Sequence, residues 1–437
     1  MSVRLRILSS LLPALLALGP ADAAVAAPLA EVCGRALAQD PELAAASQAV
    51  RELDERLTVA YTGLFPRLRV LGELASDQYT RAGGYAPLFT RAAEVGATEL
   101  IFDGGATWHR AAATRLERDA VVADRAVTAN RVAFQAAIAA LTVARNRAWL
   151  AASERYAAEH DAAVAQVAAM ARADRGKVFD LKQVTARAVF ARSQVTERRA
   201  ELAASEARLL ELSGAPAPAI DVPAPLSGPG LDALDSALSL ADGAHPALNA
   251  WRHRQASRQA AVHEAQAAFQ PLVSAEAIYR LGIDRNGLPG RNDEGYVGVR
   301  GTVALAAGGG QTSAIRAAQA ESARVASRLE SSRRDVREAV RLAWDRRAGL
   351  AATVPLAEAS DAASRAVVEG FRAQYKSGQR TVLDLLRVQA DAYGAETRLI
   401  GLRFDRLMAD YELAHSQGRL ADWLPVPDHS PLPQVSR

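Results

Sequence analysis

Leu100-Ile101-Phe102-Asp103-Gly104-Gly105 is the stretch that decides the fold, because it returns later in the chain as Leu305-Ala306-Ala307-Gly308-Gly309-Gly310. Gly104 corresponds to Gly309, so the two copies lie 309 − 104 = 205 residues apart. The same spacing separates two pairs of prolines, Pro41 from Pro246 and Pro66 from Pro271. One spacing held at three places predicts a structural unit that occurs twice, with matching corners.

Two stretches with the period-2 alternation of β-strands precede each copy of this segment. They predict one hairpin over 67–102 and a second over 272–306. Each strand is expected to have about ten residues, the length that crosses a bilayer when tilted. In the last strand, Gly298, Arg300 and Thr302 alternate with the predicted lipid-facing residues, which are Val297, Val299, Val303 and Leu305.

Long helices follow both hairpins. The segment from Ala106 to Met170 lacks proline and would form a helix on the order of 95 Å long. A shorter helix is predicted to return from Asp180 to Leu212, and a single opening helix is predicted from Leu29 to Leu64. The second copy repeats the long helix from Gln311 to Gly370 and then returns to about Leu420. Two shorter helices together match one long helix, so they could stand end to end beside it.

Glycine and proline mark the ends and bends of these elements. The predicted strand-to-helix corners, where only glycine fits, are Gly104, Gly105, Gly309 and Gly310. Each pair of helices forms a hairpin, and the two hairpins are predicted to turn near Gly176 and Gly378. Pro355 should kink the second long helix.

Residues 1–26 have the pattern of a cleavable secretory signal peptide. Arg4 and Arg6 precede a short apolar run, and Ala24-Val25-Ala26 is a small-x-small cleavage site. The alternative of a membrane anchor is disfavoured, because the run is too short for about 30 Å of hydrocarbon. The rest is predicted to comprise a first repeat at 27–213, a Pro-rich linker at 214–230, a second repeat at 231–422 and a disordered tail at 423–437.

Composition argues against several classes of function. The net charge is only +3, whereas a nucleic-acid-binding protein needs a concentrated basic face. The glycine runs lack the Lys-Ser/Thr of a phosphate loop, and the seven histidines show no metal-ligand spacing. Cys33 is the single cysteine, which excludes an intrachain disulfide, and no lipoprotein cleavage site precedes it. We therefore expect no enzyme activity, no cofactor, no metal site and no nucleic-acid partner.

The predicted fold class is mainly α with a small β portion. Four amphipathic strands cannot close a barrel, and open sheet edges are not tolerated in lipid. Three copies would supply twelve strands, an allowed number for an outer-membrane barrel. Long coiled-coil helical hairpins would continue below that barrel as a hollow bundle.

The chain resembles the TolC family of outer-membrane channel-tunnels over almost its whole mature length. The marks are Asp40-Pro41 near the start, Pro66 before the first hairpin, Leu-x-Phe-Asp-Gly-Gly ending at Gly105, and the tip Tyr375-x-x-Gly378-x-x-Thr381-x-x-Asp384. The resemblance implies a homotrimer in the lipid of the outer membrane, with an α-helical tunnel crossing the periplasm. It also implies docking of Gly176, Gly378 and Thr381 onto a periplasmic adaptor (membrane fusion) protein.

Family resemblance also implies a periplasmic gate at the helix tips. Tyr375, Arg380 and Asp384 match the family's gate pattern, although Arg380 and Asp384 could instead pair with each other along one helix. Two departures make this gate less acidic: Arg387 stands where relatives often carry an aspartate, and the first tip carries Lys182, with its acid at Asp180.

Within that family, the leading functional hypothesis is an exit duct for type I protein secretion, working with an inner-membrane transporter of the ABC or RND class. The alternative is the outer-membrane component of a multidrug or small-molecule efflux pump. A third hypothesis, from another class, is a periplasmic coiled-coil scaffold that forms no channel. The cargo is not readable from the chain.

Overall fold

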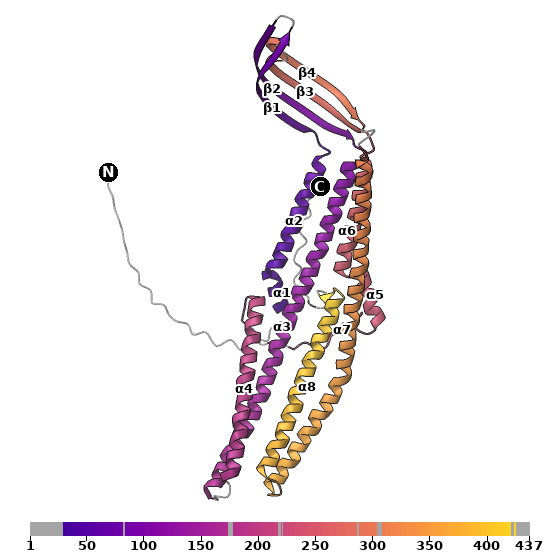
Figure 1. Ribbon diagram of the computed structural model, residues 1–437. Coiled ribbons are helices and arrows are strands. Elements are labelled where there is room, and N and C mark those ends of the chain that lie inside the picture. Colours follow the sequence, from indigo (N-terminus) through magenta and orange to yellow (C-terminus); the bar gives the residue numbers. More distant parts are fainter. Residues whose placement is uncertain are drawn as a thin grey trace, which may run out of the picture.

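The computed structural model describes residues 29–81, 84–173, 178–216, 220, 222–285, 288–303, 308–420 and 424. The protein is an elongated molecule with a β-sheet at one end and two helical hairpins reaching the other (Figure 1). The predicted signal peptide at 1–26 lies outside the described residues, and so does the predicted tail at 423–437 apart from Leu424.

The two halves contain the same series of elements (Figure 1). The first half contains α1 (Leu29–Gln39), α2 (Pro41–Thr62), β1 (Arg67–Arg81), β2 (Gly84–Phe102), α3 (Ala106–Ala173) and α4 (Val178–Ser213). The second half contains α5 (Leu234–Ala244), α6 (Pro246–Ala267), β3 (Leu272–Arg285), β4 (Leu288–Thr302), α7 (Gly310–Lys376) and α8 (Val382–Ser416).

The opening of the chain differs from the prediction of a single helix over 29–64. It forms two helices, α1 and α2, that meet at Asp40. Asp40 is extended, and its side chain accepts a hydrogen bond from the backbone N–H of Leu43 at 2.8 Å. Pro41 is the first residue of α2, where its missing N–H costs nothing and where it cannot continue α1.

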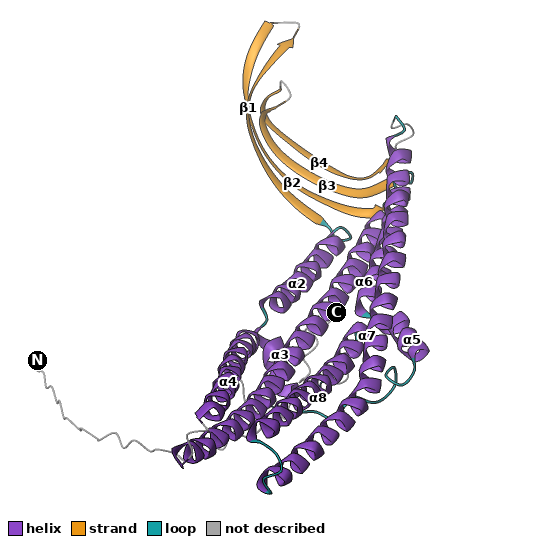
Figure 2. Cartoon of the chain, turned by 60° about the horizontal axis from the view of Figure 1, so that its bottom comes forward, coloured by secondary structure: helices purple, strands orange, loops and turns teal. Residues whose placement is uncertain are grey.

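The sheet contains β1, β2, β3 and β4 in that order, and every neighbouring pair is antiparallel. The junction of β2 with β3 joins the two halves of the chain in one curved sheet (Figure 2). The strands have 15, 19, 14 and 15 residues, so the expectation of about ten was too short. The ten-residue estimate covers the hydrocarbon alone, and these strands extend beyond it.

The helices form two long columns. α3 has 68 residues and α7 has 67, and α7 continues through Pro355 as one helix. α2 and α4 both pack on α3, and α6 and α8 both pack on α7, with the shorter helices above and below one another (Figure 1). This is the end-to-end stacking that the helix lengths predicted.

Within α3, an apolar window could cross a membrane by length and composition alone, although 44% of it is buried inside the chain. Its alanines serve the core. Ala136, Ala137, Ala140 and Leu141 are fully buried in a cluster with residues of α1 and α8. Small side chains let neighbouring helices approach closely, which explains the alanine-rich composition.

A buried carboxylate fastens the segment between the halves to the helices. Asp410 of α8 is fully buried, and its Oδ1 accepts a hydrogen bond from Arg347 Nε at 2.6 Å. Arg406 lies 3.5 Å from the same oxygen, and the backbone N–H of Leu226 donates to Oδ2 at 3.3 Å. Arg347 also donates to the carbonyl of Leu231 at 2.6 Å, so one charge cluster holds both ends of residues 226–231.

His245 repeats the role of Asp40 at the start of α6. Its Nδ1 accepts a hydrogen bond from the backbone N–H of Ala247 at 3.1 Å, and Pro246 is the first helical residue. A protonated Nδ1 could not accept this bond. The cap therefore requires a neutral imidazole.

Acidification is expected to destabilise the fold at this cap. Burial, with a further contribution from nearby His415, lowers the pKa of His245 from 6.5 to about 4. The folded pKa is the lower one, so the stability is present above pH 6.5 and is lost as the pH falls towards 4. Thermal unfolding of the detergent-solubilised protein would measure this loss. His245→Asn keeps a capping side chain that does not titrate, and should show a smaller pH dependence; an equal dependence would contradict the assignment.

Candidate membrane surface and tip gate

One face of the sheet is apolar and exposed. Successive side chains of a strand point to opposite faces, and directly opposite residues of neighbouring strands share a face. The row Leu68–Ala97–Ala277–Val297 crosses all four strands on the apolar face. Leu68 and Val297, at the two ends of this row, are 80% and 86% exposed in the single chain. Of the predicted lipid-facing residues, Val299 is also exposed on this face, Val303 lies just past the end of β4, and Leu305 lies outside the described residues.

The opposite face of the sheet carries a row of alternating charges across all four strands. Glu94 of β2 lies between Arg69 of β1, at 2.8 Å, and Arg280 of β3, at 2.6 Å. Arg280 in turn lies 3.6 Å from Glu294 of β4. The Glu94 side chain is only 5% exposed, because both arginines cover it. An apolar face and a paired, charged face are the two surfaces of a strand that separates lipid from a water-filled interior.

Tight corners connect the sheet to the long helices. Gly104 and Gly105 take φ values of +68° and +84°, and a Cβ on Gly104 would lie 2.5 Å from the Cβ of Gln270. Asp103 caps the start of α3, since its carboxylate accepts from the backbone N–H groups of Gly105 and Thr107 at 3.0 and 2.7 Å. At the second corner Gly309 takes φ +78°, whereas Gly310 already begins α7.

At the other end of the molecule, the two helical hairpins share a cavity of about 410 Å³. The cavity brings together six of the residues that the sequence singled out: Asp180, Tyr375, Gly378, Arg380, Thr381 and Asp384. Lys182 and Arg387 are exposed and do not line it, and Gly176 lies outside the described residues. Asp180 comes from α4 and the others come from the second tip, so the cavity lies between the two tips.

Asp384 has a local structural role that the sequence analysis missed. Thr381 Oγ1 accepts from the backbone N–H of Asp384 at 3.2 Å, and the Asp384 carboxylate accepts from the backbone N–H and hydroxyl of Thr381. This capping box starts α8. The hydrogen bonds from Thr381 lower the pKa of Asp384, with smaller contributions from Arg380 and Arg387. The Thr-x-x-Asp spacing is a known signal for such a cap, and it could have been recognised from the sequence.

The other second-tip residues have defined surroundings. Arg380 Nε donates to Gln374 Oε1 at 3.1 Å, and its guanidinium lies 4.8 Å from the ring centroid of Phe371. Among the ion pairs of the described residues, none joins Arg380 to Asp384, which was the alternative raised from their spacing. Tyr375 packs against the buried Val382 and Val368. The tip is thus ordered within a single chain.

Above the tips, side chains link the two helical hairpins at several levels. Tyr156 of α3 stacks on Tyr393 of α8 with ring centroids 4.3 Å apart, and the Tyr393 hydroxyl hydrogen-bonds Ser153 at 2.8 Å. Arg155 of α3 pairs with Glu396 of α8 at 2.7 Å. No sequence motif marks these residues, because each contact joins positions far apart in the chain.

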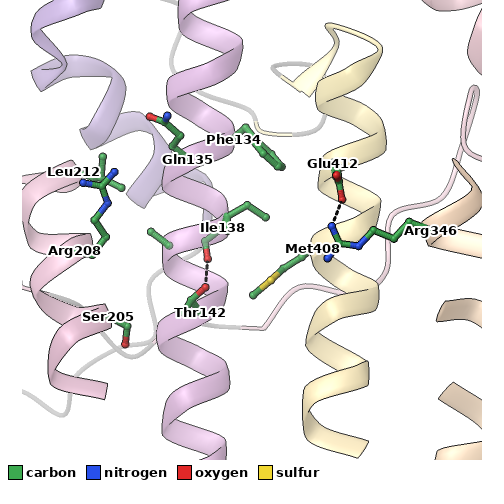
Figure 3. Close-up of a pocket in the computed structure, with 11 residues that line it drawn as sticks. Phe134, Gln135, Ile138, Thr142, Ser205, Arg208, Leu212, Arg346, Met408 and Glu412 are labelled. Carbon is green, nitrogen blue, oxygen red and sulfur yellow. Dashed lines mark hydrogen bonds and ion pairs between the residues drawn. The ribbon is translucent and has the colours of Figure 1, made fainter. Parts of the chain in front are cut away.

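A groove of about 530 Å³ lies between α3, α4 and α8 (Figure 3). Phe134 and Ile138 of α3 and Met408 of α8 give it an apolar floor, and the ion pair of Arg346 with Glu412, at 2.8 Å, closes one side. Within the described ranges, no group of three His, Cys, Asp or Glu side chains could hold a metal ion. Cys33 is buried, and burial raises the pKa of its thiol to about 12, which leaves it unreactive.

Two sequence comparisons relate this chain to outer membrane efflux proteins. Residues 237–419 match the family model "Outer membrane efflux protein". The outer membrane efflux protein BepC of Brucella suis biovar 1 (strain 1330) is 23% identical over 375 residues, which cover 85% of this chain and 81% of BepC.

Solved structures share the fold at lower identity. The Campylobacter jejuni CmeC outer membrane channel superposes with a TM-score of 0.76 at 13% identity, covering 90% of this chain and 86% of CmeC. The outer membrane protein VceC of Vibrio cholerae gives 0.74 at 17% identity, covering 89% and 96%.

The names of the matching family and of BepC refer to efflux, and neither refers to protein secretion. The comparisons therefore favour the efflux alternative over the leading hypothesis of type I protein secretion. Channels of this family are trimers that work with other efflux pump components, and they are not enzymes. With its amphipathic sheet and long helical columns, the chain has the fold of solved outer-membrane channels, and these matches make it similar to the outer membrane efflux protein (TolC) family.

Proposed function

We propose that three copies of this chain form the outer-membrane exit duct of a small-molecule efflux pump. The sheet would supply four strands of a twelve-stranded barrel, and the helices would form the tunnel below it. The observation that carries this proposal is the two-faced sheet, with its exposed apolar row on one side and its row of paired charges on the other. The efflux names of the matching family and of BepC support a small-molecule cargo.

The duct has no energy source of its own in this proposal. An inner-membrane transporter of the ABC or RND class would drive export, and a periplasmic adaptor would join it to the tips near Gly176, Gly378 and Thr381. Type I protein secretion is the second candidate, because only the tip sequence Gly378-x-x-Thr381-x-x-Asp384 and the lack of a lipoprotein cleavage site at Cys33 favour it. Deleting the gene separates the two: accumulation of small toxic compounds supports efflux, and loss of a secreted protein without such accumulation supports secretion.

The tip cavity is the proposed gate. Asp180 and Arg380 have opposite charges and line the same cavity, although they belong to different hairpins. Ion pairs between oppositely charged residues of different tips would hold the tunnel closed. Tyr375 and the more exposed Lys182 and Arg387 would contribute further contacts between the tips. Because Asp384 caps α8, we assign it to shaping the tip rather than to a bond that must break on opening.

Arg380→Ala is expected to open the tunnel more often. Exposed ion pairs are worth about 0.2–1 kcal/mol each, so three lost pairs would raise the ratio of open to closed channels by roughly 3- to 150-fold. Single-channel conductance in planar bilayers and sensitivity of cells to bulky antibiotics measure this change. Lys376→Ala removes a neighbouring exposed charge outside the cavity and serves as the control. Equal conductance in wild type, Arg380→Ala and Asp180→Asn would show that the gate lies elsewhere.

A further inference from the structure

The two outer strands of the sheet each have an edge that no described strand covers. β1 and β4 are the ends of the order β1-β2-β3-β4, and each has 15 residues. Lipid does not tolerate open edges, so both must pair with another strand. In the proposed trimer, on which this inference rests, β4 of one copy pairs with β1 of the next. The structure contains enough information to set the register of that pairing.

The first constraint is the direction of the side chains. On β1 the apolar face carries the even-numbered residues Leu68, Val70 and Leu74, and on β4 it carries the odd-numbered Val297 and Val299. Residues directly opposite each other share a face. An even-numbered residue of β1 must therefore lie opposite an odd-numbered residue of β4. A shift by one residue would turn charged side chains towards lipid.

The second constraint is the tilt of the strands. The row that begins at Arg67 passes through Thr98 and Glu276 to Gly298. Strands in a barrel are spaced about 4.8 Å apart and tilted about 35–45°. After four such strands, a row that runs perpendicular to them is displaced along the strand direction by roughly 13–19 Å, which corresponds to about four to six residues. The row that ends at Gly298 therefore meets β1 of the next copy four to six residues beyond Arg67. The first constraint leaves Leu71 and Glu73 as the possible partners of Gly298. A shift in the opposite direction would place the end of β4 against the helical residues of α2, which cannot pair with a strand.

Charge decides between the two registers. With Gly298 opposite Leu71, Arg300 lies directly opposite Arg69, and Glu73 lies diagonal to Glu294; like charges so placed destabilise a sheet. With Gly298 opposite Glu73, Glu73 lies diagonal to Arg300, within reach of its guanidinium. The second register sets Asp77 opposite Glu294, so each register contains one directly opposite pair of like charges, and members of both pairs have partners of opposite charge within their own chain. The diagonal contact of Glu73, repulsive in the first register and attractive in the second, therefore favours the second.

The two candidate partners are available at the edges of the single chain. Glu73 is exposed on the charged face, and within the described part of its own chain it forms no ion pair. Arg300 is 62% exposed at the other edge, although it already contacts Glu276 at 2.9 Å. On the lipid face the same register alternates large and small residues, placing Val70 opposite Gly301 and Gly72 opposite Val299.

We propose that β4 of each copy pairs with β1 of the next copy with Gly298 opposite Glu73, and that Glu73 pairs with Arg300 of the adjoining copy inside the barrel. Three such contacts would close the barrel. Residue Glu73 would then have the same type of partner that Glu94 and Glu276 have within the sheet.

Cysteine cross-linking tests the register directly. A disulfide needs Cα atoms about 4.4–6.8 Å apart, which directly opposite residues satisfy and residues two positions removed do not. In a Cys33→Ala background, Gly72→Cys with Val299→Cys should give covalent dimers and trimers on oxidation, whereas Val70→Cys with Val299→Cys should not. The reverse result would establish the other register and overturn the proposal.

Two further outcomes separate this proposal from the proposed function. If neither pair cross-links although trimers are present in the outer membrane, the register is wrong and the duct stands. If no trimers form even for the Cys33→Ala parent and the wild type, the proposed function itself fails. For the ion pair, Glu73→Gln should lower the temperature at which trimers dissociate in detergent, and should have no further effect in an Arg300→Gln background. Additive effects would show that the two side chains do not interact.

Discussion

Val297→Arg is expected to prevent most of the protein from assembling in the outer membrane. Val297 is 86% exposed on the apolar face, near the middle of β4. An arginine facing lipid at the bilayer midplane costs about 2–4 kcal/mol, and every copy in a trimer would carry one. Heat-modifiable trimers in the outer-membrane fraction, separated by electrophoresis without boiling, measure assembly.

Thr98→Arg is the matched control for this prediction. Thr98 lies in the adjacent row, at the same height of the sheet, but on the charged face opposite Glu276. Its arginine would enter water beside a carboxylate, so assembly should be close to that of the wild type. Equal assembly of Val297→Arg and Thr98→Arg would mean that the faces of the sheet are wrongly assigned.

Asp410→Ala is expected to cause the largest loss of stability among single changes in the helical part. The substitution leaves Arg347 and Arg406 without their shared carboxylate, and these side chains are only 16% and 18% exposed. Breaking a buried ion pair by removing one partner costs about 3–5 kcal/mol. Thermal unfolding in detergent should show the loss, and a protease should cleave near Leu226, whose backbone N–H loses its acceptor.

Asp405→Ala separates this effect from a general loss of negative charge on α8. Asp405 pairs with Arg145 at 3.2 Å, but it is 37% exposed, so its removal should cost no more than about 1 kcal/mol. Similar unfolding temperatures for the two variants would show that the Asp410 cluster does not hold the linker in place.

Local chemistry predicted much of this fold. Alternation placed the two hairpins, predicted over 67–102 and 272–306, although β4 ends at Thr302 and residues 304–306 lie outside the described part of the chain. The glycine segments placed the starts of α3 and α7, because both signals act over a few residues. The break at Asp40 was missed although it was readable, since an aspartate followed by proline is a helix start. The capping box of Thr381 and Asp384 was equally readable.

Other features depend on contacts between distant parts of the chain, and no local pattern encodes them. The pairing of β2 with β3 fixes which residues face each other, and alternation alone leaves that register open. The burial of Asp410 beside Arg347 and Arg406 could not be distinguished from the many exposed Arg–carboxylate pairs of the helices. The gate stays a prediction, because its bonds would join tips of different copies.

In the proposed barrel, the charged row of the sheet faces the interior and has a consequence for which solutes can pass it. Its two arginines, Arg69 and Arg280, balance its two glutamates, Glu94 and Glu294. Opposite charges a few ångströms apart cancel at distances beyond their separation, and salt screens the remainder within about 8–10 Å. The wall therefore presents a wet, strongly polar surface with little net electrostatic potential. A solute of either sign would meet no large barrier there, which leaves discrimination to other parts of the duct.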